Sequence, residues 1–416
     1  MPYVDIADKT TLDKIYNIIA ASQGVFGFIE HMATLAPSQR IEYIGANANY
    51  RPISLNKSTG EMSLNDWLDF PIIKANKPYM VNSDGTPAYR LDENNYSLKE
   101  DGTASDVANT AFDGGAFSWL KKVYKYESME GNDRIVKFSF EKRDGFEPVG
   151  FLDGDNNELE GLWIPMFYGS IVETKMKSIS GVQPCYSNNT TAEKAAIDAF
   201  GARARFFGGP VINVITDLLM MFAKTSDIQG AYGNGNMSGY DTSQAPTNGV
   251  KLNAVIGGGQ FYGTGDGRSL NKIFHSIVLG SWQQWMRDPY TVCVNGKMKV
   301  SLNYNYDISG ASYLDTGVNY NKEEITNGNW HYPHRYKTVP GFGAIPDYPF
   351  KGSTSLGGCD GFIVNKGITA VTLRFGCCND GTIDGVRALF VNNAASDAYW
   401  SIGAAILLLP PVSVAA

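Results

Sequence analysis

Two adjacent cysteines, Cys377 and Cys378, are the side chains near the C-terminus with the greatest chemical reactivity. A thiol becomes a nucleophile or a redox group when a neighbouring cation lowers its pKa. No His or Lys lies close to this pair in the sequence. The other three cysteines, at positions 185, 293 and 359, form no CxxC or zinc-type spacing. We therefore expect reduced thiols, no catalytic cysteine and no metal site built from cysteines.

Three further segments have the composition of ligand sites but the wrong spacing. The segment "DGDNNELEG" (153–161) departs from an EF-hand calcium loop, because Glu158 stands where that loop needs its glycine. A proline between His331 and His334 prevents the helical presentation of a zinc-protease pair. The Gly-rich segment 257–269 fits neither phosphate-binding glycine pattern. We therefore interpret the three segments as an acidic turn, an aromatic loop and a structural glycine loop. The sequence leaves open whether the acidic turn holds a structural calcium ion.

The bulk composition describes a globular chain with an acidic balance. The chain has 416 residues, of which 43% are hydrophobic and 19% charged, and its net charge is −7. An acidic balance argues against nucleic acid or an anionic membrane as the main partner. We find neither a signal peptide nor an apolar run long enough to insert into a membrane. No triad or cofactor motif is present, so we expect a binding or structural protein rather than an enzyme, without a cofactor.

The elements that must position these residues are short strands with few helices. Helical patterns cover residues 1–40, 191–206, 208–227 and 269–288. Strand and turn signals dominate the rest, including an alternating strand over 134–142 and an apolar final strand in the tail "AAILLLPPVSVAA". This pattern predicts an α+β fold with an unusually large loop fraction, and long ordered loops usually carry function.

The last 50 residues lack four common residue types. No Lys follows Lys366, no Glu follows Glu324, no Met follows Met298 and no Gln follows Gln284. If the two adenines of an Asn codon (AAC or AAT) are randomised, the products encode neither these four types nor Trp. Every other residue type present between 374 and 403 belongs to the set that such codons encode. The segment is therefore compatible with adenine-directed randomisation around a fixed Trp400.

Several segments resemble a known family. They include "LWIPMFYGSIVETKMKSISG", "FHSIVLGSWQQWMRDPYTV", "GGCDGFIVN" and, most specifically, the terminal "RFGCCNDGTIDGVRALFVNNAASDAYWSIGAAILL". The chain resembles, over roughly residues 45–416, the C-type-lectin-fold variable proteins of diversity-generating retroelements, in the branch with a formylglycine-generating-enzyme-like domain. Phe375 stands where such proteins often have a second glycine.

The resemblance implies a fold and a division of the chain. The fold is a C-type lectin-like, formylglycine-generating-enzyme-type α+β domain with two main helices, short antiparallel strands and long ordered loops. Residues 1–40 would be a helical attachment or oligomerisation segment, and residues 41–160 a β-rich part packed on the lectin-like domain. Residues 161–416 would be the ligand-binding domain, with a variable region at about 370–405.

The resemblance also implies which residues vary and which are constant. Exposed side chains of the variable region would form the ligand face, at Cys377, Cys378, Asp380, Thr382, Ile383, Asp384, Arg387, Asn393 and Tyr399. Turn-forming glycines and buried residues would form the constant scaffold, at Gly376, Gly381, Gly385, Trp400 and Gly403.

The function implied is host attachment by a phage or prophage protein. A hypervariable face on a virion tail would bind a host cell-surface protein or glycan, beside other tail proteins and within a homo-oligomer such as a trimer. The sequence names neither the ligand nor the oligomeric state. A fixed-specificity carbohydrate-binding or structural virion protein is the first alternative, and a formylglycine-generating-type oxidase is the second.

Overall fold

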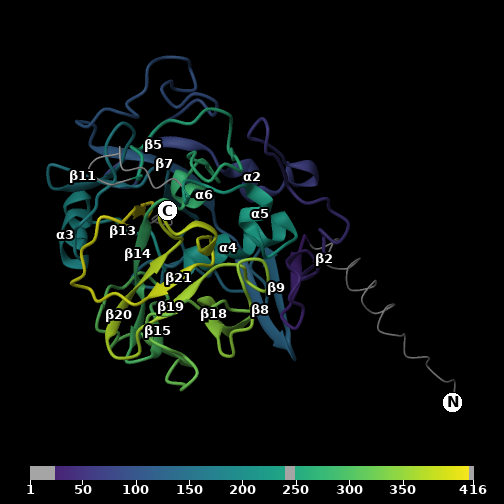
Figure 1. The fold of residues 1–416 in the computed structure, drawn as a ribbon. Coiled ribbons are helices and arrows are strands. Elements are labelled where there is room, and N and C mark those ends of the chain that lie inside the picture. Colours follow the sequence, from purple (N-terminus) through teal and green to yellow (C-terminus); the bar gives the residue numbers. More distant parts are fainter. Residues whose placement is uncertain (1–23, 239–248, 412–416) are drawn as a thin grey trace.

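The computed structural model describes residues 24–238 and 249–411, which form three main sheets and five α-helices (Figure 1). The predicted α+β class is therefore confirmed. Three further two-stranded sheets lie outside the main ones: β3 (Ser54–Asn56) with β4 (Glu61–Ser63), β11 (Gly169–Val172) with β12 (Lys175–Ser178), and β17 (Arg335–Val339) with β18 (Gly343–Asp347).

A six-stranded sheet pairs the last strand of the described chain, β23, with strands from residues 78–206. Its strand order is β13-β23-β10-β7-β5-β6. Trp163 in β10 pairs with Trp119 on one side and with Leu408 on the other. The predicted final strand is thus confirmed. The strands are β13 (Ala204–Phe206), β23 (Ile406–Leu408), β10 (Gly161–Pro165), β7 (Gly114–Lys121), β5 (Pro78–Asn82) and β6 (Pro87–Arg90).

A seven-stranded sheet carries most of the C-terminal part. Its order is β16-β15-β14-β20-β21-β19, and β22 pairs with β14. A bulge between Asp288 and Val292 accommodates Pro289, which has no backbone N–H to give to the ladder. The strands are β16 (Leu314–Asn319), β15 (Lys297–Val300), β14 (Trp285–Val294), β20 (Thr369–Arg374), β21 (Leu389–Val391), β19 (Phe362–Val364) and β22 (Ile402–Gly403).

The third sheet shows that residues 26–31 are a strand, so the helix predicted over 1–40 is wrong there. β1 (Phe26–His31) pairs with β2 (Ile41–Gly45) on one side and with β9 (Asp133–Ser139) on the other, and β8 (Tyr124–Glu130) completes the sheet. The pairing of β1 with these two neighbouring strands overrides the helical pattern of its local sequence. Residues 1–23 of that prediction lie outside the described residues. The strand predicted over 134–142 is confirmed over 134–139, as part of β9.

Two of the helical patterns produce the two longest helices among the described residues. α4 (Pro210–Ala223) begins at a proline, as its sequence predicts, and all its residues except the last are buried. α3 (Thr190–Phe200) begins at a cap, where the Asn189 side chain accepts from the Ala192 amide. It ends six residues before the predicted boundary, because the chain then forms β13.

The helix predicted over 269–288 is wrong for most of its length. Only α6 (Ile277–Ser281) forms there, and β14 begins at Trp285. Phe274, His275 and Trp282 have positive φ angles, which end the helix on both sides. The apolar residues of this segment are buried on all sides. Their spacing of three and four residues therefore reflects general burial and does not indicate an amphipathic helix. The remaining short helices are α2 (Pro71–Ala75), α5 (Ile228–Tyr232) and the 3-10 helices Pro37–Gln39, Asn65–Trp67 and Gly381–Ile383.

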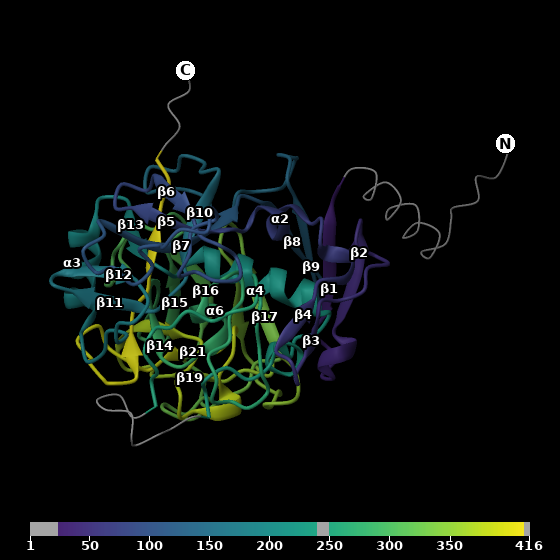
Figure 2. The same ribbon diagram turned by 90° about the horizontal axis from the view of Figure 1, so that it is seen from above.

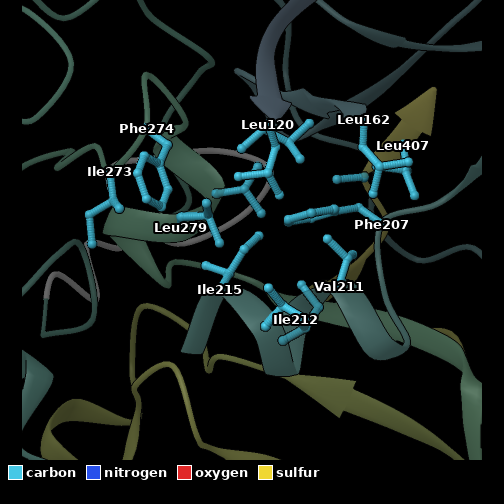
Figure 3. Packing of buried hydrophobic residues seen from close by; sticks show 14 of the residues in the cluster. Leu120, Leu162, Phe207, Val211, Ile212, Ile215, Ile273, Phe274, Leu279 and Leu407 are labelled. Atoms are coloured by element: carbon cyan, nitrogen blue, oxygen red, sulfur yellow. The ribbon is translucent and has the colours of Figure 1, made fainter. Parts of the chain in front are cut away.

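The main hydrophobic core lies between α4 and the six-stranded sheet. Ile212 and Ile215 of α4 point toward Leu120 of β7, Leu162 of β10 and Leu407 of β23 (Figure 3). Strands from both sides of the predicted boundary at 160/161 therefore share one sheet and one core. No helix in the described ranges is long and apolar enough to cross a bilayer.

Candidate functional site

The C-terminal segment 374–401 forms two outer loops, which lie along the lower edge of the molecule in yellow (Figure 2). The first loop leaves β20, passes through the 3-10 helix η3 (Gly381–Ile383) and returns to β21. Phe375 and Gly376 open it with φ angles of 78° and 135°. Side chains are disfavoured at such angles, so Phe375 holds a backbone conformation that a glycine would adopt more readily.

Five of the nine residues expected on the ligand face are buried, so the expectation of exposed side chains is wrong for them: Cys377, Cys378, Asp384, Arg387 and Asn393. The first loop folds back over the core instead of standing away from it. The Cys378 amide donates to the Gln283 carbonyl at 3.0 Å, and Cys377 packs with Trp285 and Ala388. Asn393 is held within its own loop, where its side chain donates to Asp397 at 3.0 Å.

All five cysteines are free and buried. Burial, together with nearby Asp384, raises the pKa of Cys378 to about 12. Burial also raises the pKa of Cys377 well above its ordinary value. Both thiols therefore stay protonated at neutral pH, and the environment opposes thiolate chemistry instead of promoting it.

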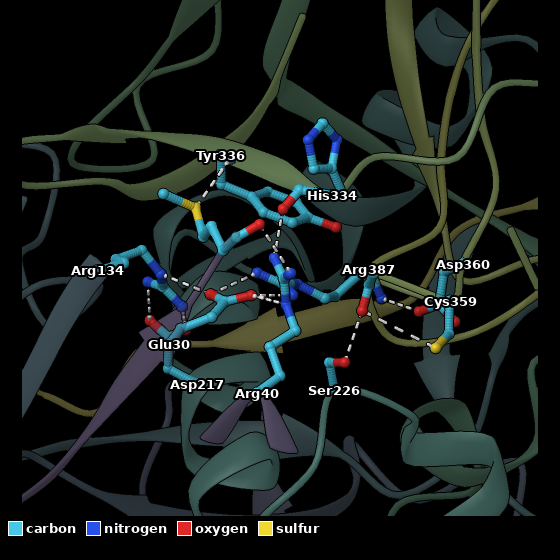
Figure 4. Close-up of polar contacts among 12 residues, drawn as sticks. Glu30, Arg40, Arg134, Asp217, Ser226, His334, Tyr336, Cys359, Asp360 and Arg387 are labelled. Carbon is cyan, nitrogen blue, oxygen red and sulfur yellow. Dashed lines mark hydrogen bonds and ion pairs between the residues drawn. The ribbon is translucent and has the colours of Figure 1, made fainter. Parts of the chain in front are cut away.

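Arg387 lies inside the molecule and binds a distant part of the chain (Figure 4). Its Nη1 and Nη2 atoms donate to Glu30 of β1 at 2.8 and 3.1 Å, and its guanidinium lies 3.6 Å above the Tyr336 ring. Glu30 also accepts from Arg40 and Arg134, each at 2.9 Å. Arg387 therefore connects the C-terminal loop to the N-terminal sheet.

Two scaffold glycines make room for buried carboxyl groups. A Cβ atom on Gly376 would lie 1.9 Å from Cγ of Asp384, and one on Gly385 would lie 2.2 Å from Oδ1 of Asp360. Neither carboxyl oxygen of Asp384 has a hydrogen-bond partner among the described residues. Burial raises the pKa of Asp384 well above its ordinary value, which favours the neutral carboxyl group, the form that costs less to bury.

The other expected residues lie at the surface to different degrees. Thr382 is exposed, Tyr399 is 52% exposed, and Asp380 and Ile383 are half-buried. Gly403 is buried, and a Cβ atom there would lie 2.5 Å from the Cys185 carbonyl oxygen. Gly381 has a φ of 68°, and a Cβ atom there would lie 3.8 Å from Ser238 Oγ, an ordinary contact distance. Trp400 is only half-buried, so the expectation of a buried Trp400 is wrong.

Four half-buried side chains form what we call the aromatic face: Trp330, Ile383, Asp380 and Phe390. Trp330 stacks on the buried Trp285 with ring centroids 6.3 Å apart, and Phe390 contacts both rings at 5.7 and 5.2 Å. Trp285 Nε1 donates to Asp380 at 2.8 Å, which fixes this carboxyl group beside the rings. Ile383 and Trp330 flank Gly361 closely.

Sequence reasoning missed Trp330 and Phe390. Trp330 precedes the C-terminal segment by more than forty residues, and only the tertiary fold brings the two together. Phe390 belongs to the residue types that randomised Asn codons encode, so its composition was a usable signal. Flat rings with one fixed carboxyl group suit a ligand that presents both an apolar surface and hydrogen-bonding groups, such as a sugar or a peptide.

Within the ranges 24–238 and 249–411, no three His, Cys, Asp or Glu side chains are placed to hold a metal ion. His331 packs against the rings of Phe350 and Phe362, as predicted for an aromatic loop. Asp153 accepts from the amides of Asp155 and Asn157, as predicted for an acidic turn. The chain matches no known protein-family model and no curated protein sequence.

Proposed function

We propose that this protein is a hypervariable ligand-binding protein with a C-type lectin-like domain, carried on a phage tail and used to attach to a host surface protein or glycan. Adenine-directed mutagenesis would diversify its region 370–405. The role is binding rather than catalysis. The α+β architecture, the two long helices α3 and α4 and the loop-rich C-terminal part support the lectin-like fold.

The residue repertoire of the C-terminal segment is the observation that carries this proposal. Lys, Glu, Gln and Met are absent after Lys366, although the preceding chain uses all four. Burial explains such a loss only at buried positions. The segment also includes exposed positions at residues 379, 382, 396, 398 and 399, where Lys, Glu and Gln are ordinarily common. A restricted codon set accounts for their absence at the exposed positions, and burial accounts for it at the buried ones.

The burial pattern narrows the set of positions that can vary. Exposed substitutions usually change stability by less than about 0.5 kcal/mol, so exposed side chains vary at little cost. We assign the variable ligand face to the accessible positions Asn379, Asp380, Thr382, Ile383, Phe390 and Tyr399. The five buried positions are constant in this proposal, because each contacts the core, the Glu30 ion pairs or its own loop.

Attachment to a tail would supply the multivalent binding that a single variable site lacks. Several copies on one virion, either a homo-oligomer such as a trimer or an array held by other tail proteins, would bind one surface together. Multivalent contact raises the overall affinity by about 10²–10⁴ without new contacts. Weak binding by each newly diversified face is then sufficient.

A fixed-specificity carbohydrate-binding protein is the alternative that one observation favours. Trp330 of the aromatic face and the buried Trp285 on which it stacks lie outside residues 370–405, so this part of the surface would be the same in every copy. A glycan array probed with this protein and with a relative that differs only within 370–405 separates the two functions. The proposal expects different ligands for the two proteins, whereas one shared sugar supports the alternative.

The decisive experiment is sequencing of the DNA beside the gene. We expect a near-identical template repeat next to a reverse-transcriptase gene, with adenines at the codons for the accessible positions. Codons for Arg387, Asp384 and the scaffold glycines should match between the template and the gene. Relatives whose differences are spread evenly over all codon positions, without such a repeat, would contradict the proposal.

A further inference from the structure

A pocket of about 250 Å³ opens between α3, β13 and the segment 304–306. α3 and β13 lie side by side in Figure 1. The residues that line the pocket include four aromatic rings, two cations and no acid. The volume is just below the roughly 300–1,000 Å³ of sites for drug-sized ligands, and it suits one sugar ring.

The floor of the pocket is rigid and offers one hydroxyl group. Phe206, Tyr290 and Tyr304 are all buried, and the Tyr304 hydroxyl is committed to the Gly150 carbonyl at 2.6 Å. The Tyr290 hydroxyl accepts from the Phe206 amide at 3.2 Å, and no described residue accepts its proton. A phenol accepts and donates at once, so this proton is available to a ligand in the pocket.

Two rings form a flat apolar wall. Tyr306 lies parallel to Phe206, with an interplanar angle of 8° and ring centroids 6.1 Å apart. Tyr306 is half-buried and lines the pocket. Such a wall favours a ligand with a flat apolar side, and it contributes binding area with little side-chain entropy to lose.

The charge at the rim is positive. Arg205 Nη1 donates to the carbonyls of Ala202 and Ala204 at 2.9 and 2.7 Å, which holds the guanidinium in place. No described residue accepts from its Nε or Nη2 atoms. Lys194 lies 5.1 Å above the Tyr306 ring, but Asp198 already pairs with it at 2.6 Å. Arg205 is therefore the main available cation, and its planar fork matches a carboxylate.

We propose that this pocket binds a single acidic sugar residue, a hexuronic acid, with its carboxylate on Arg205 and one face of its ring on Tyr306. The Tyr290 hydroxyl would donate to a ring substituent. A small inorganic anion would leave the wall unused, and a neutral sugar would leave Arg205 unused. The combination of a flat wall, one held guanidinium and one donor fits the acidic sugar best.

This site is independent of the variable ligand face. None of its lining residues lies within 370–405, so every diversified copy would keep it. It would give the protein a constant affinity for acidic surface polysaccharides, whichever ligand the variable face selects. The two proposals therefore fail separately: template sequencing tests the variable face, and sugar binding tests this pocket.

Isothermal titration calorimetry on the full chain, with sodium glucuronate, glucose and sodium acetate as probes, tests the proposal. We expect glucuronate to bind at least about tenfold more tightly than either of the other two, because only glucuronate uses both the cation and the wall. Arg205→Gln should weaken glucuronate binding by about tenfold or more, and Tyr306→Leu should weaken it independently.

Lys74→Gln is the matched control, because Lys74 is an exposed cation outside the pocket whose side chain is 73% accessible. It should bind glucuronate as the wild type does. Thermal melting of each variant checks that the fold is retained. Equal affinities for glucuronate and acetate, no glucuronate binding by the wild type, or unchanged binding by both pocket variants would overturn the proposal.

Discussion

At the residue scale, the residue types that randomised Asn codons encode occupy both buried structural positions and exposed positions in the C-terminal segment. Arg387 and Tyr399 both belong to the types that randomised Asn codons encode, but Arg387 is buried on Glu30 and Tyr399 is 52% exposed. A buried charge needs a partner, so replacing Arg387 by a neutral residue leaves Glu30 with less compensation. Residue type alone therefore does not separate a ligand contact from a structural one.

Lys272 is a buried base without an acidic partner. Its Nζ atom donates to the Tyr96 hydroxyl at 2.9 Å and to the Ile256 carbonyl at 2.8 Å, and the same hydroxyl contacts His275 Nδ1 at 2.6 Å. Burial lowers the pKa of Lys272 to about 7. An unfolded lysine keeps its proton up to a pKa of 10.5, so between these values the unfolded chain binds more protons than the folded chain.

We predict that stability rises with pH above 7 because of Lys272. In wild type relative to Lys272→Met, the free energy of unfolding should increase by up to about 1.4 kcal/mol per pH unit between pH 7.5 and 10. Urea titrations of both proteins across this range measure it. Lys74→Met, at an exposed lysine, should give a difference from wild type that does not change with pH. Parallel curves for wild type and Lys272→Met would show that Lys272 is charged in the fold.

At the element scale, the turn after β20 decides where the C-terminal loop goes. Gly376 has a φ of 135°, and the Asp384 carboxyl group occupies the space where a side chain would start. The loop can fold back over Trp285 only because no Cβ atom stands there. This geometry buries Cys377 and Asp384 and presents Thr382 at the outer end of the loop.

We predict that Gly376→Ala lowers the free energy of unfolding by about 2–5 kcal/mol, from backbone strain and overlap with Asp384 together. Gly131→Ala is the matched control, because Gly131 also has a positive φ, of 63°, but no atom within 4 Å of the added Cβ. It should cost at most about 2 kcal/mol. Urea unfolding compares the two, and equal costs would mean that the Asp384 contact adds nothing.

At the scale of the whole molecule, Glu30 connects parts of the chain that are distant in sequence (Figure 4). It accepts from Arg40, from Arg134 of β9 and from Arg387 of the C-terminal loop. Arg134 also pairs with Asp217 of α4. Burial opposes the charge of Glu30, but the three guanidinium groups together hold its pKa well below the ordinary value. One buried carboxylate and its ion pairs therefore connect the N-terminal sheet, helix α4 and the C-terminal loop.

We predict that Glu30→Gln lowers the free energy of unfolding by about 3–5 kcal/mol at pH 7, because it leaves buried guanidinium groups without their acid. Glu61→Gln, at an exposed position of β4, should change it by less than about 0.5 kcal/mol. Chemical denaturation measures both. A cost below about 1 kcal/mol for Glu30→Gln would contradict a central role for this ion cluster.

The pH dependence adds a second readout on the same residue. The folded pKa of Glu30 lies below its unfolded value of 4.5. Its contribution is therefore complete above that value and is lost as the pH falls through the folded pKa. Wild type should lose stability in acid more steeply than Glu30→Gln.

The sequence by itself determined the α+β class, helix α4, strands β9 and β23 and the restricted repertoire of the C-terminal segment. Each of these depends on residues close together in the chain, where periodicity, capping and composition act directly. The amino-acid types also predicted which part of the chain to search for a ligand face.

Only the tertiary structure decided which residues of that segment reach the surface. Glu30 and Arg387 lie 357 positions apart, and Trp330 joins Phe390 from outside the segment. Pairing with strands distant in sequence also made residues 26–31 a strand and placed the residues from Trp285 onward in β14. Burial is set by neighbours that are distant in sequence, so local patterns cannot separate an exposed Tyr399 from a buried Arg387.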